Sequence, residues 1–133
     1  MTVRSNFLRE DSVPFHEMSL DLYHQLSRDL NYNLMVSQRG MITLIQSSAA
    51  NRVALQMANT MHIYGAEYRM LTLNEVKQKI SIFDPPPDMR LPVRGGVYQP
   101  RASMVRHDAV AWGFARAADA RGVDILQNCE VTG

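Results

Sequence analysis

Residues 101–122 constrain the fold of this chain more than any other stretch, because a short loop there leads directly into an amphipathic helix. Apolar residues recur at the spacing of a helix, at Val110, Phe114, Ala117 and Ala118. This pattern predicts a helix that packs one face against the rest of the protein. We expect Asp108 to be the N-cap, since its carboxylate can accept hydrogen bonds from first-turn amides. Gly122 is expected to end the helix, with Arg121 facing the last carbonyls.

The loop before this helix carries Arg101, Arg106 and His107. His107 would lie at the mouth of the helix, where free backbone amides favour anions and disfavour an imidazolium ion. We therefore expect its imidazole to be neutral and nucleophilic at pH 7. Guanidinium groups commonly bind phosphate and carboxylate, so we expect the two arginines to flank the histidine as anion clamps. An ordinary capped helix start explains the same residues, and this alternative stays open.

A long helix is expected near the beginning of the chain, from about residue 13 to residue 30, with Ser12 as its N-cap. One apolar stripe along it consists of Phe15, Met18, Leu22 and Leu26. A second stripe consists of Leu20, Tyr23 and Leu30. Two stripes indicate that the helix packs on more than one side.

Two further helices are expected in the middle of the chain. The first covers about residues 49–64 after a cap at Ser47 or Ser48. The second covers about residues 73–79, because residues 72–75 match the Thr-x-x-Glu pattern of a capping box.

Five strands are expected, at residues 34–37, 41–46, 67–71, 91–99 and 123–132. Gln38–Gly40 joins the first two and predicts a hairpin. The last strand alternates in polarity, and Cys129 is expected to be a small core residue within it. Three consecutive prolines in Asp84–Asp88 indicate a surface connector. Strands and helices intermix without strict βαβ alternation. This favours one α+β domain over residues 1–133, with a mixed or antiparallel sheet and helices packed on one side.

Several classes of function are disfavoured by composition. The formal net charge of +1 argues against a nucleic-acid binder, and no apolar run approaches the length of a membrane span. A single cysteine excludes an internal disulfide and fits a reducing, cytoplasmic compartment. His16 and His24 share a helix face without a third ligand nearby, so we expect no metal site. The basic side chains comprise 12 Arg and 2 Lys, which suits the recognition of planar anions.

Four runs of sequence resemble one protein family. RHDAVAWGFARAADARGVDILQNCEVTG, which begins at Arg106, is similar to the β subunit of heterotetrameric sarcosine oxidase. TVRSNFL, LSRDLNYNLMVSQRG and GGVYQPR resemble the same subunit. The resemblance covers nearly the whole chain and implies a D-amino-acid oxidase-like flavoprotein fold. The family's glycine-rich FAD-binding unit has no counterpart in these residues, so we expect an internal fragment of a larger subunit.

The resemblance also implies cofactors. In the family, the histidine matching His107 carries FMN covalently through the 8α-methyl group of the flavin, with Arg106 beside it. The segment matching Val3 and Arg4 lies beside a separate, non-covalent FAD, and the backbone at Val131 resembles a position that meets the FAD nucleotide. We expect this chain to hold no cofactor alone, because it lacks a pyrophosphate cradle.

The family's reaction oxidises the N-methyl amine of sarcosine with oxygen and tetrahydrofolate, and it yields glycine, a methylene-folate and peroxide. The resemblance therefore implies a small amine and folate as substrates and the other oxidase subunits as partners. Ala102 and Ser103 stand where two glycines are expected from the family, which affects how closely a flavin can approach the backbone. The isolated chain is expected to be inactive.

Two other functions stay open. One is a non-catalytic binding module derived from the same fold, and in either case exposed sheet edges lead us to expect a homo-oligomer of the isolated chain. The other is a stand-alone enzyme with chemistry at Arg101, Arg106 and His107. It is the least supported, because no acid–base partner completes the site.

Overall fold

The computed structural model describes residues 1–86 and 88–132, so Pro87, within the predicted connector, and Gly133 lie outside the described residues. Along the described chain the elements are β1 (Thr2–Val3), α1 (Ser12–Asp29), β2 (Ser37–Gln38), β3 (Met41–Ile45), α2 (Ser48–Ile63), β4 (Arg69–Thr72), α3 (Leu73–Lys79), β5 (Gly95–Gln99), β6 (Ser103–Met104) and α4 (His107–Asp119). Within the same ranges, no helix combines the length and apolar character needed to cross a membrane.

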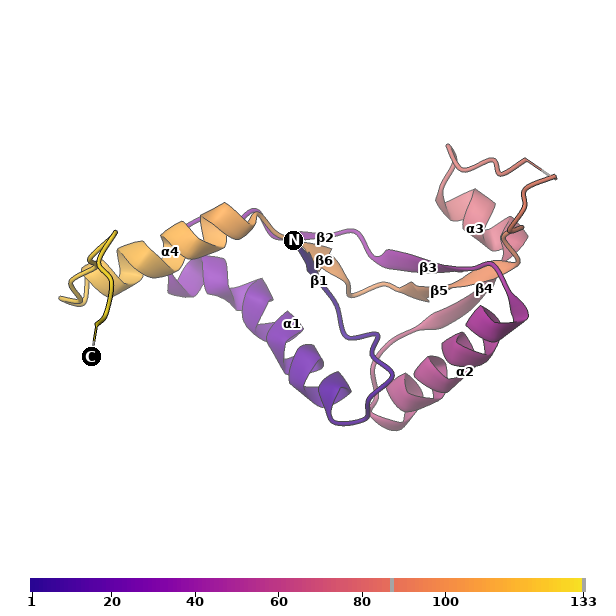
Figure 1. Ribbon diagram of the computed structural model, residues 1–133, viewed down its shortest axis with the longest axis horizontal. Helices are drawn as coiled ribbons and strands as arrows, with labels where there is room; N and C mark the ends of the chain where they lie inside the picture. Colours follow the sequence, from indigo (N-terminus) through magenta and orange to yellow (C-terminus); the bar gives the residue numbers. More distant parts are fainter. Residues whose placement is uncertain (87, 133) are drawn as a thin grey trace.

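The strands form two antiparallel sheets of three strands each, in the orders β1-β6-β2 and β3-β5-β4. Figure 1 shows the first beside the N-terminus and the second extending away from it toward α3. Gly95 lies in β5, between the outer strands β3 and β4. A Cβ atom there would collide with the carbonyl oxygen of Leu71, so only glycine permits the close pairing with β4. The predicted α+β class with antiparallel strands is confirmed.

The hairpin predicted at Gln38–Gly40 is wrong, because β2 and β3 do not pair with each other. β2 pairs with β6, and β3 pairs with β5. Gly40 adopts a left-handed φ of 74°, and its amide donates to the carbonyl of Ala102 at 2.9 Å. The chain therefore passes from one sheet to the other at this glycine, beside the β5–β6 connection, which runs in the opposite direction.

The main core lies between α2 and one face of the β3-β5-β4 sheet. Its buried members are Val13, Ile45, Ala54, Met57, Met61, Ala66 and Val97. The short α3 lies against the opposite face, since the position of a Cβ on Gly96 is 3.5 Å from Val76, and neighbouring residues of a strand point to opposite faces. The helical layer predicted on one side thus consists of α1 and α2. The short α3 packs on the opposite face of the β3-β5-β4 sheet (Figure 1).

Capping signals in the sequence are largely confirmed. Ser47 caps α2, and its hydroxyl accepts from the Ala50 amide at 3.0 Å. The capping box of α3 is present in both directions between Thr72 and Glu75. At the end of α4, Gly122 has a left-handed φ of 81°. Arg121 donates to the Ala117 carbonyl at 2.8 Å.

The first helix packs on the second of its two predicted stripes, through Leu20 and Tyr23, and leaves most of the first stripe exposed. Val13 and Leu20 are its buried residues. Phe15, Met18 and Leu22 are exposed by 67, 62 and 53%. The prediction of packing on both stripes is therefore wrong for this chain, in which one apolar stripe of α1 faces outward. Its predicted cap is also wrong, because the helix begins at Ser12 and follows Asp11.

The strand predicted at residues 123–132 is wrong. The segment pairs with no strand in the described chain, and Leu126 and Val131 are exposed by 78 and 90%. Cys129 is also exposed, not a core residue. Alternation in polarity gives a segment two distinct faces, but a strand also needs a partner for its backbone groups, and none lies beside this segment.

Candidate functional site

The loop that carries His107 is anchored by strand pairing immediately before α4. β6 lies between β1 and β2. The amide of Val105 donates to the Met1 carbonyl at 3.0 Å, and the amide of Arg106 donates to the Leu34 carbonyl at 3.4 Å. Three separate parts of the chain therefore converge on the residues that precede His107.

The N-cap predicted at Asp108 is wrong, because α4 begins at His107 and its N-cap is Arg106, two residues before the predicted one. Arg106 has an extended backbone, so helical geometry starts at His107 and places Asp108 inside the first turn. Arg106 Nε and Nη2 donate to the two oxygens of Asp108 at 3.1 and 2.8 Å. These hydrogen bonds are the main reason why the pKa of Asp108 falls to about 2, and the same pairing raises the pKa of Arg106.

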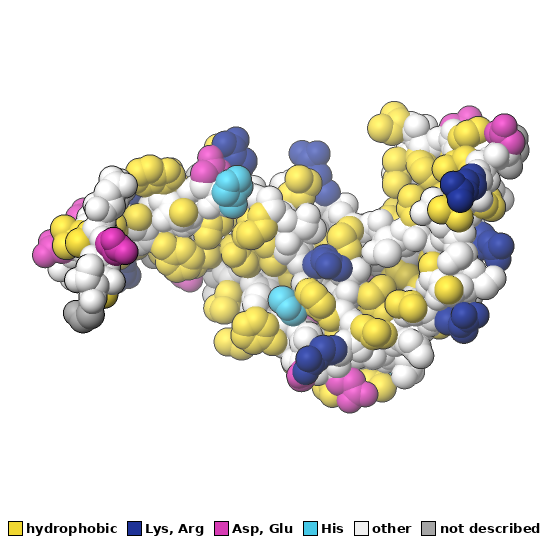
Figure 2. Space-filling view, viewed as in Figure 1, with side chains coloured by type: hydrophobic (Ala, Val, Ile, Leu, Met, Phe, Trp, Pro, Cys, Tyr) yellow, Lys and Arg dark blue, Asp and Glu magenta, His cyan; other side chains and the backbone are white. Residues whose placement is uncertain are grey.

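His107 is exposed at this helix start. Within the described ranges, its imidazole takes part in no hydrogen bond or salt bridge. Figure 2 shows histidine, basic and acidic side chains meeting at the start of α4, next to hydrophobic ones. The Arg106 side chain is 63% exposed, and its third nitrogen lies outside the pairing with Asp108. The site thus offers an accessible imidazole and one free guanidinium edge.

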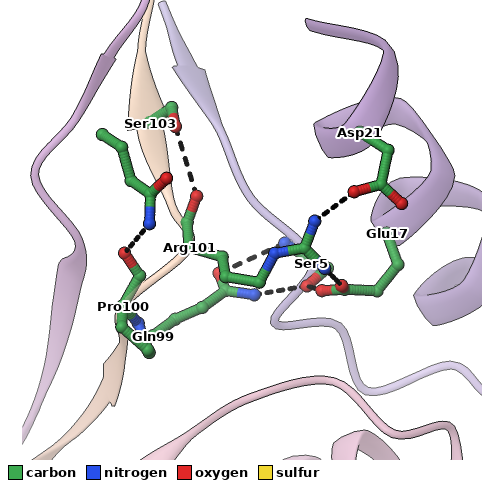
Figure 3. Close-up of polar contacts among 8 residues, drawn as sticks. Ser5, Glu17, Asp21, Gln99, Pro100, Arg101 and Ser103 are labelled. Carbon is green, nitrogen blue, oxygen red and sulfur yellow. Dashed lines mark hydrogen bonds and ion pairs between the residues drawn. The ribbon is translucent and has the colours of Figure 1, made fainter. Parts of the chain in front are cut away.

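Arg101 does not share this arrangement with Arg106. Its two terminal nitrogens donate to Glu17 and Asp21 of α1, as Figure 3 shows. The Arg101 side chain is 29% exposed and that of Glu17 only 15%. The structure therefore brings Arg106 and His107 together, while the guanidinium of Arg101 is occupied by carboxylates of α1.

The remaining predicted site residues lie elsewhere. Val3 is buried in β1, and Arg4 follows it, with its Nη1 donating to Asn6 at 2.7 Å. Both residues line a hollow of about 250 Å³ between the N-terminal segment and α1, together with Phe7. Val131 lies in the exposed C-terminal segment. Figure 1 places that segment at the far end of α4, away from β1.

α4 approaches the rest of the molecule closely at Gly113, the buried residue of this helix. Val110, on the predicted stripe, is partly buried and packs against the cluster of Val3, Leu20 and Val105. A Cβ atom at Gly113 would lie 2.9 Å from Leu34 and 3.2 Å from both Leu30 and Tyr32. Phe114, predicted on the packed stripe, is 51% exposed. That part of the prediction is wrong, because the helix packs through its smallest residue, and the large side chains lie on either side.

No group of three or more potential metal ligands lies together among the described residues. His16 stacks on the ring of Phe7, with ring centroids 4.0 Å apart.

Sequence reasoning missed the polar network around Arg101. Glu17 and Asp21 are four residues apart, which places both on one helix face. That spacing was visible in the sequence, but its partner lies 84 and 80 residues away and no local pattern connects them.

Comparisons with known proteins identify the family of this chain. A family model described as FAD dependent oxidoreductase matches residues 3–133. Sarcosine oxidase subunit beta of Rhizobium meliloti is 45% identical over 131 residues, and that of an Arthrobacter species is 42% identical over 131 residues. Each match covers 98% of this chain, and 31% and 32% of the respective relative. The chain therefore spans about a third of the length of these relatives.

Two solved structures share the fold. L-proline dehydrogenase from P. horikoshii superposes with a TM-score of 0.84 at 19% identity, over 98% of this chain and 33% of that one. Glycine oxidase from Geobacillus kaustophilus superposes with a TM-score of 0.73 at 18% identity, over 91% of this chain and 33% of that one.

Proposed function

Since the chain belongs to the FAD dependent oxidoreductase family, we propose that it forms the central part of a flavin-dependent amine oxidase subunit resembling sarcosine oxidase subunit beta. The supporting observation is the similarity to that subunit across nearly the whole chain, including the run around His107. The proposed reaction is the oxidative demethylation of sarcosine to glycine, linked to folate and producing peroxide. The other subunits of such an oxidase are the proposed partners, and the chain alone is proposed to be inactive.

Within this function, His107 is the proposed attachment point of FMN. The exposed imidazole fits that role, because a ring nitrogen that carries the flavin covalently would need open access to it. Arg106 offers its free guanidinium edge to a negatively charged part of the same group. Arg106 also forms an ion pair with Asp108, so the positive charge of its guanidinium is already balanced by a carboxylate before any anion binds. FMN held here would supply a redox-active ring.

FAD is the proposed second cofactor of the whole subunit. Arg4 is the residue of this chain best placed to meet it, because its side chain is half-buried at the hollow beside β1. The backbone of Val3 is fixed by pairing with Ser103 of β6 and links this region to the loop that carries His107. Val131 is also proposed to contact the nucleotide, and its exposure leaves it accessible.

A non-catalytic binding module is the alternative, and the exposed apolar side chains favour it. Figure 2 shows hydrophobic side chains gathered over α4 and α1. Trp112, Phe114 and Phe15 are all exposed by more than half. A homo-oligomer that covers these faces would appear in light scattering as a mass above 15.1 kDa. A monodisperse monomer would contradict that oligomer.

The proposed function is tested by grafting. In one chimera, this chain replaces the 131 matching residues of the Rhizobium meliloti subunit, and in a smaller one only residues 101–122 are exchanged. Both are expressed with the other subunits of that enzyme and with riboflavin. We expect the intact mass to show one covalent FMN, lost in His107→Ala and kept in His24→Ala. Folded chimeras that carry no FMN, or a His107→Ala variant that keeps it, would refute the attachment.

A further inference from the structure

A buried polar network joins three segments that are distant in sequence. Gln99, at the end of β5, donates from its side chain to the hydroxyl of Ser5, and the Ser5 amide donates back to Gln99 Oε1 at 3.2 Å. The Ser5 hydroxyl donates to one oxygen of Glu17, and Arg101 donates to the other. Ser5 is 0% and Gln99 1% exposed. Both oxygens of Glu17 are therefore engaged, one by the N-terminal segment and one by the β5–β6 turn (Figure 3).

The same turn is fixed on its other side. The side chain of Gln38 donates to the Pro100 carbonyl at 3.2 Å, and the Ser103 hydroxyl donates to the Arg101 carbonyl at 3.2 Å. β6 follows at once and leads through two residues, Val105 and Arg106, to His107. This turn is therefore the start of the chain path through β6 into α4.

Charge excludes a simple anion clamp at Arg101. Its one positive charge faces two carboxylates, from Glu17 and Asp21, so the cluster carries a formal charge of −1. A phosphate or carboxylate ligand would be repelled by this cluster. Removing the Glu17 charge would make it less repulsive toward anions.

Helix α1 connects this cluster with the site. Its middle carries Glu17 and Asp21, and the residue that follows the helix, Leu30, lies against Gly113 of α4. Arg116 of α4 also lies over the ring of Tyr32, 5.2 Å from its centroid. The helix therefore contacts the β5–β6 turn near its middle and α4 just after its last turn. In sequence, His107 lies between the two contacted residues, Arg101 and Gly113.

We propose that Glu17, acting through Arg101, is a positioning residue for His107: it sets the orientation of the loop and helix start from which the imidazole reaches the flavin. This inference rests on the proposed function of His107. In this proposal Arg101 holds the β5–β6 turn against α1 and does not contact the anionic part of FMN.

The variant Glu17→Gln distinguishes the two possible roles of Arg101, positioning the loop and binding FMN. If Glu17 positions the loop, Glu17→Gln and Arg101→Gln each lower the limiting rate of FMN attachment about tenfold or more, because small misplacements of reacting groups are costly. The FMN concentration at half-maximal rate stays unchanged. Glu17→Gln combined with Arg101→Gln is no slower than either single variant, since both remove the same interaction. If Arg101 instead binds FMN, Glu17→Gln leaves the rate unchanged or increases it, and Arg101→Gln raises the half-saturating concentration.

The measurement uses the full chimera, with apoprotein incubated with FMN and covalent flavin followed by intact mass. Glu10→Gln, an exposed carboxylate outside the network, is the matched control and should behave as the parent. The exchange of charges in Glu17→Arg with Arg101→Glu should recover part of the rate. Thermal melts define a temperature at which every variant is folded, so that loss of fold does not imitate loss of position.

The outcomes separate the two proposals. A parent chimera without covalent FMN, or retention of FMN in His107→Ala, overturns both. Attachment that depends on His107 but proceeds at the parent rate in Glu17→Gln overturns only the positioning role. In the 133-residue chain itself, Glu17→Gln should shift the backbone amide resonances of Arg106 and His107. Shifts confined to α1 and to residues 99–103 would also contradict the positioning role.

Discussion

Helices α2 and α4 carry similar apolar patterns but contribute very differently to the structure. α2 buries five residues against the sheet, whereas the buried residue of α4 is Gly113. The large apolar residues of α4, Trp112 and Phe114, are exposed by 58 and 51%. An amphipathic pattern therefore shows that a helix has an apolar face, but it does not show that the face is covered within the same chain.

The same contrast applies to the two helix starts. α2 begins with a serine that caps the backbone directly, and α4 begins without a side-chain cap. The residue proposed to bind the flavin lies on the less supported helix. Its position consequently depends on a small number of contacts, which makes each of them accessible to experiment.

The largest effect is expected in the core under α2. Met61 is 0% exposed and packs in the main cluster, so Met61→Ala should lower the free energy of unfolding by about 2–5 kcal/mol, through lost burial and the cavity left behind. Urea denaturation followed by circular dichroism measures this change. Val53→Ala, on the exposed side of α2, is the control and should cost much less. Equal costs for the two variants would show that α2 does not pack as described.

A smaller effect is expected where α4 meets the chain. Gly113→Leu forces a side chain into the space held by Leu34 and should cost about 1–3 kcal/mol through overpacking. Trp112 is the single tryptophan, so its fluorescence reports on α4 separately from the circular dichroism of the whole chain. We expect the fluorescence transition to move to lower urea. Ala111→Leu, at an exposed position, should leave it in place, and a shift of equal size there would contradict packing through Gly113.

A still smaller effect is expected at the cap of α2. Ser47→Ala removes the acceptor for the Ala50 amide and should lower the free energy of unfolding by about 1 kcal/mol. Ser48→Ala, at the first helical residue, keeps that hydrogen bond and should cost less in the same urea experiment. The reverse order would mean that Ser48, and not Ser47, is the N-cap of α2.

These comparisons also show how far sequence reasoning reaches. Helix limits, the Ser47 cap and the capping box of α3 were predictable, because each depends on residues within one or two turns. The pairing of β2 with β6 was not, since the partner lies more than 60 residues away and turn chemistry at Gly40 suits a hairpin equally well. The strand predicted around Cys129 failed for the related reason that alternation specifies no partner.

The site was predictable to a similar degree. The approach of Arg106 to the start of α4 follows from their adjacency in sequence. Arg101 is nearly as close in sequence, but its partners are on α1, and long-range ion pairs leave no local signal. Glu17 and Asp21 could be recognised in the sequence as one acidic helix face. Their partner, Arg101, could be identified only from the structure.

The smallest effect concerns the start of α4, where Arg106 replaces a side-chain cap by pairing with Asp108. The pKa of Asp108 is lowered from 3.8 to about 2, so its contribution to stability is complete above pH 4 and is lost as the pH falls through about 2. Arg106→Gln should raise the titration midpoint toward 3.8, as measured by the carboxyl carbon resonance in NMR. Arg9→Gln removes an equivalent pair with Asp11 and should leave Asp108 unchanged. A midpoint that stays near 2 in Arg106→Gln would mean that the Asp108 carboxylate is stabilised mainly by the first-turn amides of α4. Both helices would then begin with a side chain that accepts hydrogen bonds from backbone amides, and the contrast between them would disappear.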